Sequence, residues 1–301
     1  MYYLEGKSQA EVAAAVGVSR SNVSRVLANA RANGIVEIRI NDPFGRDSDL
    51  EQALISKYGL SACLIAPSGP SETALARVGA LGAAWLTENL PASGKIGLSW
   101  GSSVHAVVDE FVADPVHGSL EILPLVGGLS SVNFARDGNV LVRTLAIKLG
   151  ASHRVLHAPA VVQSAEAQRA FLNEPSISSV LTDASHAQIA IVGIGSVGVG
   201  QSSAIIDAMK LAETEQREFD ASGVVGDCCT RCFDADGTPI TNSVNDHVVA
   251  IDLASLSNIR TVVGVASGAA KVAGVSGALR GGLFDVLVAD SALALALLEK
   301  R

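Results

Sequence analysis

Residues Ser8–Arg31, with the sequence SQAEVAAAVGVSRSNVSRVLANAR, are the stretch from which the rest of the chain can be interpreted. Ser8 and Glu11 have the spacing of a capping box, which starts a helix. Gly17 ends that helix, because glycine accepts the left-handed backbone of a helix C-terminus. Ser19 then caps a second helix. The stretch therefore predicts two helices joined by a tight turn.

Both helices are expected to turn an apolar face inward. The apolar positions of the first are Val12, Ala13 and Val16, and those of the second, at i, i+3, i+4 and i+7 spacing, are Val23, Val26, Leu27 and Ala30. The other side of the second helix is small, polar and rich in arginine, which suits the major groove of DNA. The predicted DNA contacts are Ser19, Arg20, Ser21, Asn22, Ser24 and Arg25. The competing interpretation is a helical hairpin with a solvated face.

The residues that follow indicate a winged helix. Gly34 ends the second helix, and Ile35–Ile40 alternates apolar and polar residues as a strand does. A winged helix ordinarily has a further helix before this pair, whereas only Met1–Lys7 precede it here. Either that first helix is truncated or the true start lies upstream, and the sequence leaves both open.

Composition limits the class of protein. The 301 residues are 49% hydrophobic and carry a net charge of −8, which allows a large core and argues against a protein that coats nucleic acid. Residues 1–46 hold six Lys and Arg against four Asp and Glu, so the head is mildly basic. No apolar run approaches the roughly 18–20 residues of a membrane span, and no signal peptide is evident. We therefore expect a cytoplasmic protein with no membrane partner.

Asn41–Asp49 contains Pro, Gly and Asp and is the expected linker, so the predicted domains are residues 1–45 and 46–301. Beyond it strands alternate with helices. The expected strands are 62–66, 95–100, 120–126, 153–156, 188–193, 261–266 and 285–289, with 248–251 as a further candidate. The expected helices are 50–58, 73–88, 103–111, 139–149, 165–187 with a break at Pro175, 269–279 and 291–298. Continuous apolar strands between helices predict a doubly wound α/β domain around a parallel sheet.

Several predicted strands are followed by glycine and small polar residues, at the sheet edge where ligands bind in this fold class. Ser99–Ser103 enters a helix, and backbone N–H groups with two hydroxyls there make a phosphate cradle. Lys271, in the first turn of a later helix, can reach an anion. These features favour a phosphorylated sugar or polyol. Gly193, Gly195 and Gly198 match a dinucleotide-binding string, but no clear helix follows directly, so NAD is disfavoured.

The polar residues near Cys228, Cys229 and Cys232 are ambiguous. Asp227 and Asn245 can meet ligand hydroxyls or serve as turn residues. The three cysteines lack a complete zinc ligand set, since His247 is the one nearby candidate for a fourth ligand. Reduced thiols are the favoured interpretation, and no cofactor is expected.

The chain resembles the SorC/DeoR-type sugar-binding transcriptional regulators of bacteria. The resemblance runs over nearly the whole chain, through Tyr2–Ile40 in the head and, in the body, Gly97–Ser103, Pro124–Gly128, Asn139–Val142, Val192–Gly195, Gly226–Asp227, Asn245–Asp246 and Lys271. It implies a domain similar in fold to phosphosugar isomerases that works as a sensor, in which a sugar phosphate rearranges the oligomer and changes operator affinity. It also implies a homodimer or homotetramer. Two departures stand out: Thr230 replaces a common glycine, and Cys229 and Cys232 replace larger apolar residues.

The resemblance places the phosphate on Gly101, Ser102 and Ser103, with Lys271 reaching across from the Gly268 loop. The full set of expected effector-binding residues is Ser99, Trp100, Gly101, Ser102, Ser103, Gly127, Gly128, Asn139, Gly195, Asp227, Asn245, Gly268 and Lys271.

The predicted function is a regulator of carbohydrate metabolism that binds operator DNA, with activation or repression left open. One alternative is an isomerase- or deaminase-like enzyme acting on phosphosugars in the same pocket. The helix-turn-helix head and the lack of an evident acid–base pair count against it. Another alternative is a sensor that has lost DNA binding through truncation.

Overall fold

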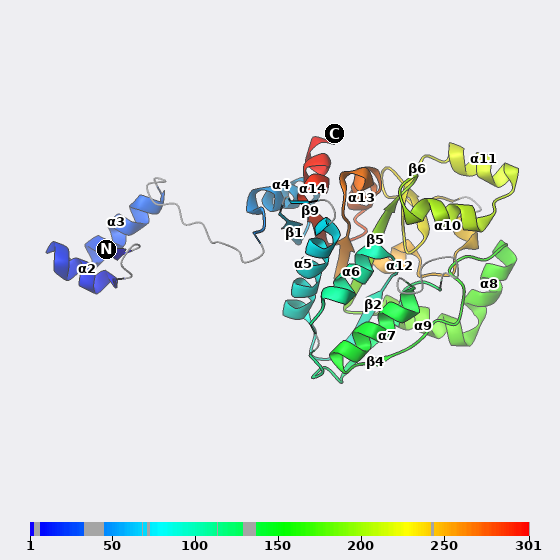
Figure 1. Cartoon of the computed structure of the whole chain (residues 1–301), viewed down its shortest axis with the longest axis horizontal. Coiled ribbons are helices and arrows are strands. Elements are labelled where there is room, and N and C mark those ends of the chain that lie inside the picture. Colours follow the sequence, from blue (N-terminus) through cyan, green and yellow to red (C-terminus); the bar gives the residue numbers. More distant parts are fainter. Residues whose placement is uncertain are drawn as a thin grey trace. The chain divides into compact units, whose positions relative to one another are not determined.

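The computed structural model describes residues 1–2, 7–32, 45–67, 69–70, 73–112, 114–128, 137–241 and 244–300. Two units make up the chain, Met1–Pro43 and Phe44–Arg301, and each is described by itself (Figure 1). The expected wing strand, Ile35–Ile40, and the helix end at Gly34 lie outside the described residues.

The N-terminal unit contains helices α2 (Gln9–Val16) and α3 (Arg20–Ala32). The predicted capping box is confirmed: the Ser8 hydroxyl accepts from the Glu11 N–H at 3.3 Å, and the Glu11 carboxylate accepts from the Ser8 N–H at 2.8 Å. Gly17 ends α2 with φ of +71°. The Ser19 hydroxyl accepts from the backbone N–H of Asn22 at 3.2 Å. The two helices and the tight turn are therefore as the sequence predicted.

The apolar faces of this unit are only partly covered. Ala13 and Val23 are buried, as expected. Val16 and Val26 are instead 58% and 64% exposed, so the prediction that they point into a core is wrong for the described unit. Two short helices bury only the side chains along their mutual contact, which is narrower than the full apolar stripe.

The second unit is built on a parallel sheet in the order β1-β9-β8-β5-β2-β3-β4. Its strands are β1 (Ala62–Ala66), β2 (Gly94–Leu98), β3 (Leu120–Pro124), β4 (Ser152–His153), β5 (Ile189–Ser196), β8 (Val262–Val265) and β9 (Val286–Asp290). Side chains alternate between the two faces of the sheet, and each face has its own hydrophobic core. The neighbouring residues Leu64 and Ile65, for example, belong to different cores. Both faces are therefore buried, and the predicted doubly wound α/β fold is confirmed.

Helices cover the two faces of this sheet (Figure 1). One face packs against α5 (Ala74–Asn89), α6 (Ser102–Glu110) and α7 (Gly138–Leu149). The other packs against α4 (Ser48–Tyr58), α9 (Pro175–Ser185), α13 (Val272–Arg280) and α14 (Ser291–Glu299). The remaining helices are α8 (Ala165–Asn173), α10 (Gln201–Met209), α11 (Glu213–Ala221) and α12 (Leu253–Ser257). No helix in the described ranges is both long and apolar enough to span a membrane.

The main difference from the predicted elements is an antiparallel hairpin, β6 (Val224–Cys228) and β7 (Arg231–Asp234). It pairs with the end of β5, which therefore runs on to Ser196. The sequence did not predict this hairpin, because glycine, aspartate and cysteine interrupt its alternation. The candidate strand 248–251 forms only isolated bridges, to Val126 and Val161, and the strand expected at 153–156 is reduced to β4.

Candidate functional site

A cavity of about 220 Å³ lies beyond the carboxyl ends of β2 and β5, which are neighbours in the sheet. From β2 the chain enters α6 on one face, and from β5 it continues through α10 to the hairpin that packs with the other core. Such a point, where successive connections leave in opposite directions, is the usual ligand site of a doubly wound sheet. The lining residues are Ser99, Trp100, Gly101, Ser102, Ser103, Gly193, Ile194, Gly195, Val199, Gly200, Ser202, Ile205, Asp227, Cys229, Thr230 and Lys271.

The structure brings most of the predicted effector residues together here. Those that line the cavity are Ser99, Trp100, Gly101, Ser102, Ser103, Gly195, Asp227 and Lys271. Those that do not line it are Gly127, Gly128, Asn139, Asn245 and Gly268.

The two asparagines outside the lining hold loops in place. Asn245 is buried; its side chain accepts from the Cys232 N–H at 2.8 Å and donates to the carbonyls of Cys232 at 3.0 Å and Ile240 at 2.7 Å. The Asn139 side chain accepts from the Leu156 N–H at 2.9 Å and donates to its carbonyl at 3.2 Å. Both side chains thus have their hydrogen bonds within the fold.

The three glycines outside the lining have backbone roles. A Cβ at Gly127 would lie 2.5 Å from the Pro159 backbone, so the close approach of two chain segments requires glycine there. Gly128 forms a bridge with the same proline. Gly268 has φ of +96°, and its N–H donates to the Asp290 carboxylate at 2.6 Å. That bond fixes the turn before Lys271.

The start of α6 has features that are common at anion-binding helix ends. Gly101 has φ of +111°, a conformation that favours glycine, and it precedes the first turn of the helix. Unpaired backbone N–H groups and the helix dipole favour negative charge at such an end. The Ser103 hydroxyl is buried, with the residue 3% exposed, and has no hydrogen-bond partner among the residues that the structure describes. A buried hydroxyl that lines a cavity without a partner is free to bind a ligand oxygen.

Lys271 lines the same cavity and comes from the short 3₁₀ turn Ala269–Lys271. Its position is set by Ser196, whose hydroxyl donates to the Lys271 carbonyl at 3.0 Å and accepts from the Gly274 N–H at 2.8 Å. Burial lowers the pKa of the Lys271 amine, while the nearby carboxylates of Asp227 and Asp290 act in the opposite direction. The cavity therefore contains a cation that burial has partly deprived of solvation.

Asp227 lines the same cavity and is partly buried. Burial raises the pKa of its carboxyl; the Ser202 hydroxyl, which donates to it at 2.6 Å, and the charge of Lys271 oppose that rise. The sequence showed no evident acid–base pair, yet the fold brings Asp227 and Lys271 to one cavity. A Cβ at Gly195 would collide with the Asp227 carboxylate and the Ser202 hydroxyl. This close packing accounts for the glycine at position 195, so its match to a dinucleotide-binding string needs no bound dinucleotide.

The β6–β7 turn contributes Cys229 and Thr230 to the cavity wall. Their φ values are +51° and +66°, so both central residues of this two-residue turn are left-handed. Hairpins of this kind ordinarily use Asn-Gly, because other residues pay about 1–2 kcal/mol each for that backbone. The Thr230 hydroxyl accepts from the indole N–H of Trp100 at 3.2 Å, and the Thr230 backbone acts to lower the pKa of the Asp227 carboxyl.

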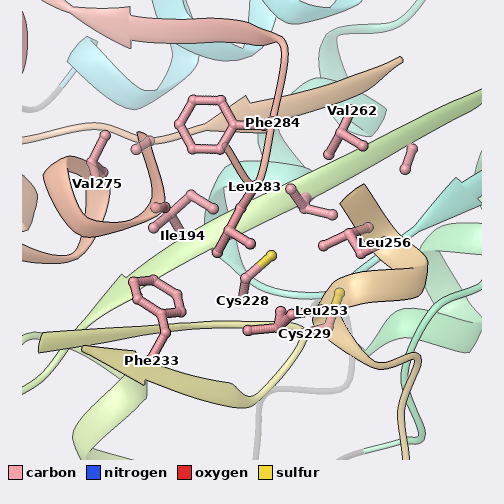
Figure 2. Packing of buried hydrophobic residues seen from close by; sticks show 14 of the residues in the cluster. Ile194, Cys228, Cys229, Phe233, Leu253, Leu256, Val262, Val275, Leu283 and Phe284 are labelled. Carbon is pink, nitrogen blue, oxygen red and sulfur yellow. The ribbon is translucent and has the colours of Figure 1, made fainter. Parts of the chain in front are cut away.

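The four cysteines are free and buried. Figure 2 shows Cys228 and Cys229 among the apolar side chains beside the hairpin. A hydrogen bond with Cys229, together with burial, raises the pKa of the Cys228 thiol, and burial raises that of Cys232. Such thiols stay protonated at neutral pH and are poor nucleophiles. Within the described ranges no three His, Cys, Asp or Glu side chains gather as a metal site would need, His247 included.

The predicted DNA-contacting residues lie at and just before the start of α3. All six are exposed: Ser19, Arg20, Ser21, Asn22, Ser24 and Arg25. The first turn of α3 contains no acidic residue, which leaves its N-terminus favourable to phosphate. This surface has the composition that a major-groove helix requires.

Known proteins match the chain over its whole length. The family described as "Putative sugar-binding domain" matches residues 42–299. The chain belongs to this family. The sorbitol operon regulator of Klebsiella pneumoniae is 29% identical over an alignment of 302 residues, which covers 99% of this chain and 95% of that protein. The deoxyribonucleoside regulator of Bacillus subtilis (strain 168) is 28% identical, with the same two shares.

Structural similarity extends over the same length. The crystal structure of the full-length sorbitol operon regulator SorC from Klebsiella pneumoniae has a TM-score of 0.78 at 28% identity and covers 99% of this chain and 96% of that one. The resemblance to SorC/DeoR-type regulators that the sequence indicated is confirmed.

In this SorC/DeoR-type chain, half of the cavity lining was absent from the sequence prediction: Gly193, Ile194, Val199, Gly200, Ser202, Ile205, Cys229 and Thr230. Ser202 and Ile205 come from α10, which the sequence did not predict, and Cys229 and Thr230 come from the unpredicted hairpin. Gly193 was within reach of sequence reasoning, since it stands in the glycine-rich loop after β5.

Proposed function

We propose that this chain is a DNA-binding transcriptional regulator of carbohydrate metabolism whose affinity for its operator is controlled by a bound phosphorylated sugar or polyol. The observation that carries the proposal is that Ser103, at the start of α6, lines one cavity with Lys271 and has a buried hydroxyl without a partner among the described residues. A helix N-terminus, a hydroxyl without a partner in the described residues and a half-buried cation together favour a phosphate group.

The rest of the cavity suits the hydroxyls of a sugar or polyol. Asp227 and Ser202 offer a carboxylate and a hydroxyl, and Thr230 offers a second hydroxyl. Trp100 and Ile205 add apolar surface for the carbon chain. A volume of about 220 Å³ is small and favours a compact ligand over a dinucleotide.

The regulatory part of the proposal is supported by the head and by the relatives. The start of α3 exposes a small, polar surface with Arg20 and Arg25, as a recognition helix does. Two relatives that match 99% of this chain are named as regulators. We infer that the protein acts as a homodimer or homotetramer, since operators are commonly read by symmetric pairs of such helices.

Two measurements test this function. A thermal-shift screen against phosphorylated sugars and polyols, each paired with its unphosphorylated form, should reveal a ligand that stabilises the protein only when phosphorylated. DNA selected from a random pool should then bind with an affinity that this ligand changes. If neither phosphate dependence nor any ligand effect on DNA binding is found, the proposed function is wrong.

One observation favours a second candidate, an isomerase- or deaminase-like enzyme acting on phosphosugars. Asp227 and Lys271 share the cavity, and burial shifts both pKa values toward the neutral forms, as in many active sites. Incubating the protein with the phosphorylated ligand and following its conversion by NMR decides the point. Turnover that Asp227→Asn abolishes would support the enzyme, and an unchanged ligand would support the regulator.

A further inference from the structure

The turn between β6 and β7 is unusual in its backbone. Among the residues that the structure describes, Lys210, Cys229 and Thr230 are the non-glycine residues with positive φ, and two of the three are adjacent in this turn. Thr230 is β-branched, a residue type for which this conformation is a genuine outlier. A strained conformation of this kind persists only where the surroundings hold it in place, and such residues gather at functional sites.

The surroundings of Thr230 are those of the cavity. The residue is 1% exposed and lines the cavity wall. Its hydroxyl accepts from the Trp100 indole at 3.2 Å, so threonine and tryptophan together form one part of that wall. The effect of Thr230 on the pKa of Asp227 comes from its backbone, which a glycine would also supply. Replacing Thr230 with glycine would therefore remove only the hydroxyl and methyl groups of its side chain from the cavity wall.

We propose that Thr230 is a specificity-determining residue of the effector cavity, whose side chain limits the length of the polyol chain that fits beside Trp100. The proposal rests on the proposed function, because it assumes a phosphorylated polyol or sugar in this cavity. A hydroxymethylene unit, which is one carbon and its hydroxyl, is no larger than the threonine side chain. Glycine at this position would open room for such a unit, and its hydroxyl could accept from the Trp100 N–H in place of Thr230.

The test compares linear polyol phosphates of four to seven carbons by calorimetry. Discrimination by chain length is measured as a ratio of two dissociation constants. The numerator is that of the polyol phosphate one carbon longer than the best wild-type ligand, and the denominator is that of the best ligand itself. We expect Thr230→Gly to reduce this ratio by about tenfold or more, because one extra methylene group in a pocket commonly changes discrimination by at least about tenfold. Thr230→Ser, which keeps the acceptor for Trp100 and loses only the methyl group, should give an intermediate ratio.

Thr238→Gly is the matched control. Thr238 is an exposed threonine just after the same hairpin and does not line the cavity, and the bond to Asp234 that it makes uses its backbone N–H. This variant should keep the wild-type ratio.

Two outcomes would overturn the proposal. In the first, Thr230→Gly retains the wild-type ratio, either with unchanged affinities or with every ligand weakened equally, which would mean that Thr230 only supports the fold. If wild type binds none of the polyol phosphates and no sugar phosphate, the proposed function itself is refuted and this proposal falls with it. Binding by wild type with an unchanged ratio in Thr230→Gly refutes the specificity role alone.

Discussion

Replacing Ser103 with alanine should stabilise the ligand-free protein and weaken ligand binding at the same time. The two effects have one cause. The Ser103 hydroxyl lines the cavity, is buried and has no partner in the described structure, so it lowers stability until a ligand oxygen pairs with it.

The expected magnitudes follow from that burial. A buried polar group left unpaired costs about 1–3 kcal/mol, and the alanine variant recovers part of this cost. For a domain of this size, each kcal/mol raises Tm by about 2–4 °C. A hydrogen bond to a charged phosphate is worth about 1.5–3 kcal/mol, so affinity for the phosphorylated ligand should fall roughly 10- to 100-fold.

Urea denaturation without ligand measures the first effect, and calorimetry with the ligand found in the screen measures the second. Ser276→Ala is a matched control. Ser276 lies in α13, is fully buried and does not line the cavity, and its hydroxyl also lacks a partner within the described ranges. It should stabilise the protein and leave affinity unchanged. If Ser103→Ala lowers stability or binds ligand as tightly as wild type, the assignment of this hydroxyl to the phosphate is refuted.

Other substitutions address separate parts of the chain. Lys271→Ala should blunt the response to a sugar phosphate and leave ligand-free DNA binding intact. In wild type, affinity should fall as pH rises through the lowered pKa of Lys271, below the usual lysine value, and calorimetry across pH should show no such fall in the variant. Asn245→Ala should destabilise the protein by about 2–4 kcal/mol in urea denaturation, because three buried hydrogen bonds to the backbone are lost. A smaller loss of stability together with weaker ligand binding would show instead that Asn245 binds the effector. Arg25→Ala should weaken specific DNA binding by about 1–3 kcal/mol if Arg25 reads a base, and an unchanged footprint would exclude that role.

The site was predicted best where local chemistry alone decides the structure. Gly101–Ser103 combines a glycine turn with hydroxyls at a helix start. This combination can be recognised from the sequence without knowing which residues pack against it. Asn245 shows the limit of such reasoning. Its amide looked as suitable for a ligand as for a loop, and only the packing of Cys232 and Ile240 around it shows that its hydrogen bonds are used within the fold.

The sequence by itself determined the doubly wound sheet, the capped helix pair and most of the loops at the sheet edge, because periodicity, capping and turn chemistry act over a few neighbouring residues. Only the tertiary structure decided that β2 and β5 are neighbours, that a hairpin carries Asp227 and Thr230 to their ends, and that Lys271 and Ser103 line one cavity. Those contacts join residues that are far apart in the chain. Their formation depends on burial and strand order, which local sequence patterns do not encode.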